Sequence, residues 1–303
     1  MFENKTILIT GGTGSLGKKL TERLLKQNPK KIIIYSRDEL KQSEMKKKYP
    51  DKDIRYFIGN VRDRDRLKRA MEGVDFVIHT AALKQVDTLE YNPFEAVQTN
   101  IIGAKNVIEC AIDNKVKKVV ALSTDKACQP INLYGFTKGV NDKLFQHANV
   151  YAKDHDIKMA VVRYGNVAGS RGSVIPFFKN MKKSGAEFLP VTDPEMTRFY
   201  ITLNQAVDLI FTAFSEMKGG EIFVSKLPSF KITDLVEAFE MGAVVTGIRP
   251  GEKLHEQMIS IYDKYDEYKD YFVIHANGEK TGLDYNSKNN DYMTIQELRE
   301  MIK

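Results

Sequence analysis

The 303-residue chain has little that would indicate a secreted, metal-binding or membrane-spanning protein. Its two cysteines, Cys110 and Cys128, predict neither a disulfide framework nor a metal site. No apolar run approaches the roughly 20 residues that a membrane span requires. A predicted strand begins at Lys5, which leaves no room for a signal peptide. These absences predict a cytoplasmic protein that has no metal and no membrane partner.

Charge of one sign is in slight excess, because the formal net charge is +6 and the sequence pI is about 9.0. Such a balance suits nucleic acid or an anionic small molecule. The densest basic run, Lys46–Lys48, lies at a predicted helix end and is interpreted as a solvated surface. Because no aromatic residues interleave with it, we predict no nucleic-acid partner.

Short apolar runs alternate with amphipathic stretches through the first half of the chain. Strands that alternate with helices form a parallel sheet with helices on both faces, so we predict an α/β, Rossmann-type, doubly wound fold. The predicted strands are Lys5–Thr10, Lys31–Tyr35, Ile54–Ile58, Asp75–His79, Lys118–Ser123 and Lys158–Tyr164. The predicted helices lie near 15–28, 38–48, 63–72, 93–114 and 132–154.

The alternation changes after residue 165, which predicts two unequal parts. We expect a Rossmann domain over residues 1–165, rejoined by elements near 200–225, including a helix from Thr202 and a strand at Glu221–Ser225. A smaller C-terminal substrate-binding lobe and tail are expected from residues 166–199 and 226–303. In that part we predict helices near 174–185, from Thr233 and from Thr294, and a short strand near 244–247.

A glycine-rich turn follows the first predicted strand. Gly11, Gly14 and Gly17 recur at three-residue intervals between a strand and a helix, the pattern of a loop whose backbone approaches a pyrophosphate. We therefore predict dinucleotide binding. Further residues expected at the cofactor are Thr13, Ser15 and Leu16 in the same loop, Asn60 and Val61 after the third strand, and Ala81, Ala82 and Lys84 after the fourth.

The end of the second strand bears on the choice of dinucleotide. An acidic residue there favours a free ribose 2′-hydroxyl, whereas an arginine suits a 2′-phosphate. Here Ser36 and Arg37 come first, and Asp38 follows them. We therefore predict NADP rather than NAD, against the alternative that Arg37 pairs with neighbouring acidic residues on the surface.

Tyr134 and Lys138 form the most informative pair in the chain. Residues four apart share a helical face, so the lysine is expected to lower the pKa of the phenol, which can then exchange a proton with a substrate alcohol. Asp125 and Lys126 add a candidate acid and base just upstream. A second copy of the spacing, from Tyr265 to Lys269, is interpreted as a solvated surface.

These motifs together resemble the extended short-chain dehydrogenase/reductase superfamily and, more narrowly, the inverting UDP-N-acetylglucosamine 4,6-dehydratases of the pseudaminic acid pathway. The resemblance spans roughly residues 3–260. It is the combination of motifs that is specific to this family, and the motifs include TGGTGSLG at 10–17, YSRDELKQSEM at 35–45, LSTDKA at 122–127, INLYGFTK at 131–138, RYGNVAGSRGSVIPFF at 163–178 and GIRPGEKLHE at 247–256.

The resemblance implies a lyase that borrows a hydride without net redox change. Tyr134, assisted by Lys138 and Thr124, would take the proton of the sugar 4-hydroxyl while NADP⁺ takes the C4 hydride. Asp125 and Lys126 would then eliminate water across C5 and C6, the hydride would return to C6, and C5 would be reprotonated from the opposite face. A homo-oligomer, such as a hexamer, is also implied.

The Asp125–Lys126 pair must work as acid and base, which a tight ion pair would oppose. Burial raises the pKa of an aspartate and lowers that of a lysine, so we expect the two side chains to flank the C5–C6 bond separately or to share one proton. The alternative is a structural ion pair. Candidate groups for the UDP-sugar are Lys84, Asn166, Arg171, Arg198, Arg249 and Glu252.

The sequence departs from the family pattern in places. Asn60 stands where aspartate is usual, and Phe136 replaces a small residue and could narrow the sugar pocket. The segment 238–246 and the tail are short. Alternatives are a dehydratase that retains C5 or stops at the 5,6-alkene, a UDP-sugar 4-epimerase, which needs no Asp125–Lys126 pair, and a non-catalytic NADP-sensing protein.

Overall fold

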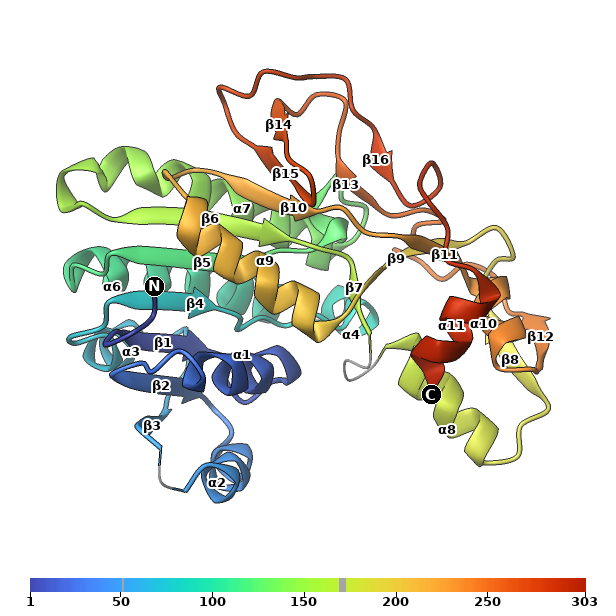
Figure 1. Ribbon diagram of the computed structural model, residues 1–303, viewed down its shortest axis with the longest axis horizontal. Helices are drawn as coiled ribbons and strands as arrows, with labels where there is room; N and C mark the ends of the chain where they lie inside the picture. The colour runs from blue at the N-terminus through green and yellow to red at the C-terminus, as the bar shows by residue number, and fades with distance from the viewer. Residues whose placement is uncertain (51, 169–172) are drawn as a thin grey trace.

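A nine-stranded sheet forms the centre of the protein in the computed structural model, which describes residues 1–50, 52–168 and 173–303 (Figure 1). Its strand order is β14-β15-β10-β6-β5-β4-β1-β2-β3. The strands from β10 to β3 pair in parallel, in the Rossmann order, so the predicted fold class is confirmed. These strands are β1 Thr6–Thr10, β2 Lys31–Ser36, β3 Ile54–Ile58, β4 Phe76–His79, β5 Lys118–Leu122, β6 Lys158–Arg163 and β10 Ile222–Ser225.

Helices cover both faces of the sheet, as its apolar strands require. Strands such as Thr6–Thr10 are buried throughout, because a parallel sheet buries both of its faces. Helices α3, α6 and α7 lie side by side on one face, and α1 and α9 lie together on the other (Figure 1). Their bounds are α1 Ser15–Leu25, α2 Glu39–Lys48, α3 Arg64–Ala70, α4 Val86–Glu90, α6 Gly103–Asp113, α7 Leu133–Tyr151 and α9 Leu203–Glu216.

The helix predicted over 93–114 is interrupted. It consists of α5 Pro93–Ala96, a π-helical segment η1 at Val97–Ile102, and then α6. Within η1 the buried Asn100 amide accepts from the Leu83 backbone N–H and donates to the Leu83 carbonyl, both at 2.9 Å. The wider turn accommodates this clamp, which fixes the loop after β4 beside the site.

A second, smaller hydrophobic cluster forms the C-terminal lobe. It packs Phe178, Leu189, Phe239 and Leu298 away from the main core. The lobe carries helices α8 Val174–Lys183, α10 Ile232–Ala238 and α11 Ile295–Ile302 (Figure 1). Its strands are β7 Asn166–Val167, β8 Phe188–Val191, β9 Thr197–Ile201, β11 Ser229–Lys231, β12 Gly242–Val245, β13 Gln257–Ile259 and β16 Tyr285–Asn286.

Part of the predicted tail joins the main sheet. Strands β14 Tyr265–Glu267 and β15 Tyr271–Ile274 extend the main sheet, with β15 antiparallel to β10. Tyr265 is buried in β14, so the prediction that its Tyr–Lys spacing marks a solvated surface is wrong for the tyrosine. The reason is an unpaired edge of β10, which the tail covers with apolar residues such as Phe272.

The chain also forms short 3₁₀ segments, η2 at Asp125–Ala127 and η3 at Lys153–His155. The helices predicted from Thr202 and Thr294 both begin with a capping box, in which Thr202 and Gln205 bond reciprocally at α9 and Thr294 and Glu297 do so at α11. Among the residues that the structure describes, no helix combines the length and apolar character of a membrane span.

Candidate functional site

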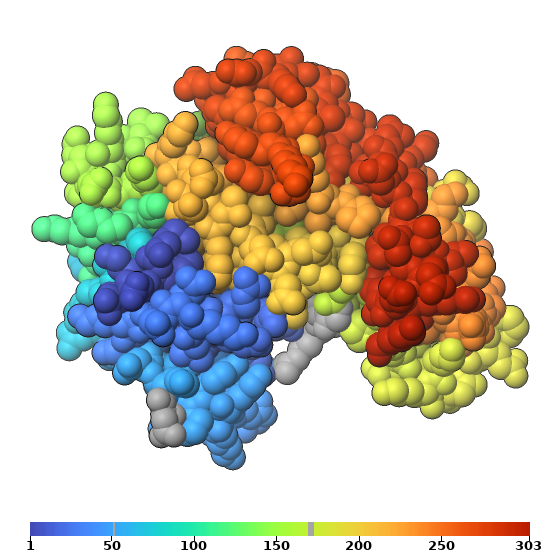
Figure 2. All heavy atoms as spheres, viewed as in Figure 1, coloured from blue at the N-terminus to red at the C-terminus, as the bar shows by residue number. Residues whose placement is uncertain are grey.

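A cavity of about 1100 Å³ opens at the carboxyl ends of the central strands, between the Rossmann sheet and the lobe. The surface is visibly hollowed between the N-terminal half and the lobe that carries α8 and α11 (Figure 2). This is where ligands bind in doubly wound sheets. The predicted residues that line it are Gly11, Gly14, Ser15, Leu16, Gly17, Ala81, Ala82, Lys84, Thr124, Lys126, Tyr134, Lys138, Asn166, Arg198, Arg249 and Glu252.

The glycine turn has the shape of a phosphate cradle. Gly11 has φ +65°, and a Cβ there would lie 2.9 Å from Ala81. A Cβ on Gly17 would lie 2.4 Å from the Gly12 carbonyl, so only glycine lets α1 begin so close to β1. Gly14 caps α1 without a side chain, which leaves the first amides of the helix open to the cavity. The residues present therefore fit a dinucleotide pyrophosphate.

Several residues predicted at the cofactor lie outside the cavity wall. Ser36 is buried and its hydroxyl accepts from Gln42 Nε2 at 2.9 Å, while Arg37 is exposed at the end of β2. Asn60 holds a turn, its side chain accepting from the Arg62 N–H at 3.1 Å. Thr13 and Val61 are buried in the protein rather than in the cavity wall.

Tyr134 and Lys138 both line the cavity from the first turns of α7. Burial raises the pKa of Tyr134 to about 12, against the opposing effects of the Lys126 ammonium and a hydrogen bond with Thr124. Burial likewise lowers the pKa of Lys138 to about 8, partly offset by Asp142. The prediction that Lys138 lowers the pKa of this phenol is wrong for the protein alone, because the loss of hydration outweighs nearby charge.

Asp125 and Lys126 form an ion pair rather than standing apart. The Lys126 Nζ lies 3.1 Å from Asp125 Oδ1 and 2.8 Å from Glu256 Oε1, so the ammonium bridges two buried carboxylates. Burial raises the pKa of Asp125, as predicted. For Lys126 burial acts to lower the pKa, but the two carboxylates outweigh it and raise the pKa, contrary to the prediction. Asp125 itself lies behind Lys126, fully buried.

Glu256 was not predicted as a site residue. It lines the cavity just before β13, and burial opposes its ionisation while Lys126 and Arg198 lower its pKa. It closes the GIRPGEKLHE segment, but nothing in the spacing of that segment relates it to residues 130 positions earlier. Only the fold brings it to Lys126.

The candidate UDP-sugar residues have mixed environments. The buried Arg198 donates to the backbone carbonyls of Thr197 and Leu254, at 2.7 and 3.1 Å. Arg249 is exposed and pairs with Glu252 and, at 3.5 Å, with Asp87. Asn166 lies in β7, and Lys84 has a pKa lowered by burial and by Lys126. Arg171 lies outside the described residues.

Phe136 is 54% exposed and is absent from the cavity wall. The prediction that it narrows the sugar pocket is therefore wrong. Gly135 lies on the buried side of α7, and the side chain of the next residue, Phe136, points away from the cleft.

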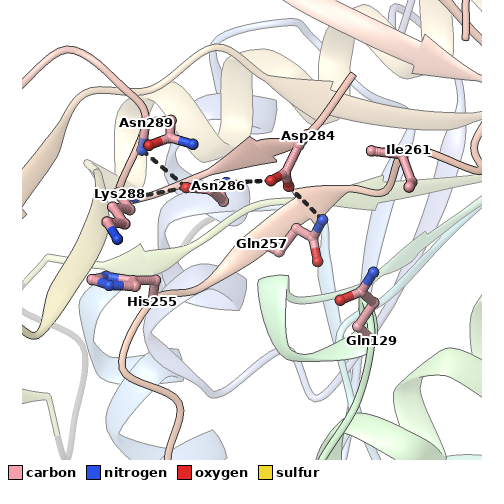
Figure 3. Close-up of a pocket in the computed structure, with 8 residues that line it drawn as sticks. All are labelled: Gln129, His255, Gln257, Ile261, Asp284, Asn286, Lys288 and Asn289. Carbon is pink, nitrogen blue, oxygen red and sulfur yellow. Dashed lines mark hydrogen bonds between the residues drawn. The ribbon is translucent and has the colours of Figure 1, made fainter. Parts of the chain in front are cut away.

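A second, smaller pocket of about 380 Å³ lies between the tail and the loop after η2 (Figure 3). Gln257 donates to Asp284 at 2.7 Å across one side of it, and Asn286 accepts from the Lys288 and Asn289 N–H groups at 2.9 Å on another. His255 faces this pocket, whereas the next residue, Glu256, faces the large cavity.

Comparisons with known proteins agree with this architecture. A UDP-N-acetylglucosamine 4,6-dehydratase (inverting) from Campylobacter jejuni is 51% identical, covering 100% of this chain and 98% of the relative. A UDP-glucose 4-epimerase from Rickettsia massiliae is 41% identical, covering 100% and 96%. The X-ray structure of Pen from Bacillus thuringiensis superposes with a TM-score of 0.95 at 40% identity, covering 100% and 98%.

The resemblance drawn from the motifs is thereby confirmed at the level of the whole chain. The family described as polysaccharide biosynthesis protein matches residues 7–276, which include the glycine turn, the Tyr134–Lys138 pair and Glu256. The chain belongs to this polysaccharide biosynthesis protein family.

Proposed function

We propose that this protein is a 4,6-dehydratase that converts UDP-N-acetylglucosamine into a UDP-4-keto-6-deoxy-hexosamine with inversion at C5. The observation that carries the proposal is the grouping of Tyr134, Lys138 and Lys126 on one cavity wall, with Asp125 bonded to Lys126. The inverting dehydratase that is 51% identical over the whole chain supports the substrate and the stereochemistry.

The glycine turn and the α1 N-terminus would hold a nicotinamide dinucleotide by its pyrophosphate, with Ala81 and Ala82 beneath it. When bound, this cofactor would supply hydride transfer. Tyr134 would accept the proton of the sugar 4-hydroxyl, and Thr124 would orient the phenol through their hydrogen bond. Lys138, buried one turn further along α7, would add its charge to the same cavity wall.

We infer a preference for NADP over NAD. Asp38 caps α2, accepting from the Lys41 N–H at 2.9 Å, and also pairs with the Lys41 ammonium. Arg37 makes no hydrogen bond or ion pair within residues 1–50, 52–168 and 173–303, so its guanidinium is available to a 2′-phosphate. Arg37→Ala should weaken binding of NADP more than of NAD, measured by titration of both.

Asp125 and Lys126 would carry the elimination. A ketone at C4 acidifies the C5 hydrogen. Lys126 would remove this hydrogen after passing its own proton to Asp125, whose pKa is raised by burial, and Asp125 would then protonate the departing 6-hydroxyl so that it leaves as water. Lys126 is an ammonium in the structure, so the binding of substrate must shift its proton before it can act as a base. We propose that the proton moves to Asp125, so that the pair shares it.

The substrate nucleotide would lie towards the lobe. Arg249 and Lys84 offer cations on the cavity wall for the diphosphate, and Glu252, now paired with Arg249, would accept from a ribose hydroxyl. Arg198, buried and occupied by backbone carbonyls, supports the wall behind Glu256, and Asn166 would face the sugar or cofactor.

The relatives named as UDP-glucose 4-epimerases make epimerisation the second candidate. An epimerase needs the Tyr134–Lys138 pair but no acid and base at C5 and C6. The buried Asp125–Lys126–Glu256 group, which costs free energy to bury, favours the dehydratase.

Product analysis in D₂O separates these functions. With UDP-N-acetylglucosamine, NMR should show a 4-keto-6-deoxy product with inverted, deuterated C5. Retained C5 or a persistent 5,6-alkene would favour the related dehydratases, and a C4 epimer without water loss would favour the epimerase. Cofactor binding without any turnover would favour the sensing protein.

Tyr134→Phe provides the test of the proton acceptor. Turnover should fall about 10²- to 10⁴-fold, the usual contribution of a positioned acid–base group. Binding of NADP and the unfolding temperature should stay near the wild-type values, because the ring is kept. Unchanged turnover would reject the role of this phenol.

We propose a homo-oligomer, for which the family resemblance suggests a hexamer, and exposed aromatic residues support self-association. Tyr91 and Phe94 are 88% and 82% exposed, and α4 and α5 pack against α7, which presents Phe136 to solvent. Apolar groups gathered on adjacent elements are typical of an interface. The buried, unpaired Cys110 and Cys128 suit the reducing cytoplasm, which we propose as the location.

A further inference from the structure

The Lys126 ammonium is held by two carboxylates that come from distant parts of the chain. Asp125 and Glu256 are 0% and 1% exposed, and each places one oxygen within 3.1 Å of Nζ. The other oxygen of each carboxylate, Asp125 Oδ2 and Glu256 Oε2, is buried without a hydrogen-bond partner in the described structure. The family-derived roles of Asp125 and Lys126 leave this second carboxylate unexplained.

Glu256 is positioned by a buried network rather than by chance packing. Its backbone N–H donates to Ser287 Oγ at 2.9 Å, and the Ser287 N–H donates to the Glu256 carbonyl at 2.8 Å. Ser287 Oγ lies 2.7 Å from Thr197 Oγ1, which in turn lies 2.8 Å from His255 Nδ1. Because His255 faces the pocket of Figure 3, the chain direction here aims Glu256 at the cleft.

Cations outnumber carboxylates around Lys126, so the loss of either carboxylate changes its surroundings strongly. Arg198 Nε lies 3.9 Å from Glu256 Oε1 and partly offsets its charge. The groups whose charges act on this cluster are Asp125 and Tyr134 from the Rossmann side, Lys84 from the loop after β4, Arg198 from β9, and Lys253 and Glu256 from the segment before β13.

We propose that Glu256 is a positioning residue for the dehydration, holding the Lys126 amine beside Asp125 and setting the pH range in which that pair serves as base and acid. The proposal rests on the function proposed above for Asp125 and Lys126. Glu256 acts through them and need not touch the sugar.

The sign of the effect follows from its charge. A negative neighbour favours the protonated form of both a lysine and an aspartate. Removing it should therefore let Lys126 lose its proton, and Asp125 lose its proton, at lower pH. The acidic and the alkaline limb of the plot of rate against pH should therefore both move to lower pH. A merely structural role of Glu256 would not move them.

Glu256→Gln keeps the shape of the side chain and removes its charge. The pH profile of kcat should shift to lower pH by about one unit or more, the usual effect of one close charge. Glu256→Asp, which restores the charge, should restore the position of the profile even if kcat stays reduced. A lower kcat with an unshifted profile in Glu256→Gln would overturn the proposal.

Glu267→Gln is the matched control. Glu267 also bridges two lysines, with Lys226 at 2.9 Å and Lys280 at 2.7 Å, but it lies on the surface, away from the cleft. Its loss should leave the pH profile of kcat unchanged. A shift as large as that of Glu256→Gln would show a general charge effect and would also overturn the proposal.

A second measurement does not depend on turnover. Labelling of Lys126 by acetic anhydride across a pH series, read by mass spectrometry, reports where the amine loses its proton. In the wild type the midpoint should lie above that of exposed lysines, and in Glu256→Gln it should fall. A wild-type midpoint below theirs would overturn the proposal even if the variant did not fold. Absence of dehydration by the wild type would instead count against the proposed function alone.

Discussion

At the scale of single residues, two glycines of the turn have different roles: Gly17 is required for packing, and Gly14 faces the ligand cavity. Gly17→Ala would place a Cβ 2.4 Å from the Gly12 carbonyl, a backbone atom that cannot move freely. We expect a loss of about 1–3 kcal/mol in the free energy of unfolding, as overpacking usually costs, together with weaker dinucleotide binding. Urea unfolding and cofactor titration measure the two effects.

Gly14→Ala is the matched variant. A Cβ there meets only the Gly11 carbonyl, at 3.2 Å, and otherwise projects towards the cavity. Stability should change little, while dinucleotide affinity falls. Equal losses of stability in the two variants would contradict this division of roles.

Lys138 should make stability depend on pH. Its pKa is about 8 in the folded protein and 10.5 for an unperturbed lysine, so the unfolded chain binds more protons between these values. Stability contributed at this site therefore rises with pH through that window, by about 3 kcal/mol in total. Relative to Lys138→Met, which does not titrate, the wild type should gain stability from pH 8 to 10. A constant difference in urea unfolding free energy would contradict the shift.

Residue patterns predicted the site unevenly. The glycine turn and the Tyr134–Lys138 pair are each formed by residues close together in the sequence, so their spacing alone predicted them as site residues, and both line the cavity. Glu256 and the ion pair with Lys126 depend on tertiary packing, which brings position 256 to position 126. The raised pKa of Tyr134 depends on burial, which spacing does not report.

At the scale of elements, the capping boxes give the clearest prediction. Thr202 accepts from the Gln205 N–H at 3.2 Å, and Gln205 accepts from the Thr202 N–H at 2.9 Å, at the start of α9. Thr202→Ala should lower the unfolding free energy by about 1 kcal/mol. Thr212→Ala, inside the same helix, should change it by less. Equal effects in thermal unfolding would show that the cap contributes nothing.

Most strands and helices of the Rossmann half were predicted because periodic apolar residues mark them directly. The π-helical segment was not, because it depends on the Asn100 clamp to Leu83. Strands β14 and β15 were also missed. β14 is polar, and β15, although apolar, has only four residues within a polar tail, so neither is marked by a long periodic run.

At the scale of the whole molecule, the exposed Tyr91, just after α4, and Phe94, on α5, predict self-association. Replacing Tyr91 and Phe94 by aspartate should lower the molecular mass found by light scattering, because charge opposes burial of that face. Tyr262→Asp, which changes another aromatic residue with 85% exposure, is the control and should leave the mass unchanged. A monomeric wild type would contradict the oligomer.

The two-part organisation was predicted only in outline. The alternation of strands and helices changes after residue 165, which indicated a second unit, and a separate hydrophobic cluster lies in that part of the chain. Its boundary could not be read from composition, since the tail contributes to both parts.

The path of the tail has a consequence for how the protein is made. Residues 265–274 complete the edge of the large sheet, and Ser287 and α11 then join the lobe (Figure 1). During translation, the large sheet cannot reach its finished form until residue 274 has left the ribosome, and the lobe cannot do so until α11 has emerged. A stalled nascent chain ending near residue 260 would therefore expose an open strand and an undocked Glu256, and should be a target for chaperones.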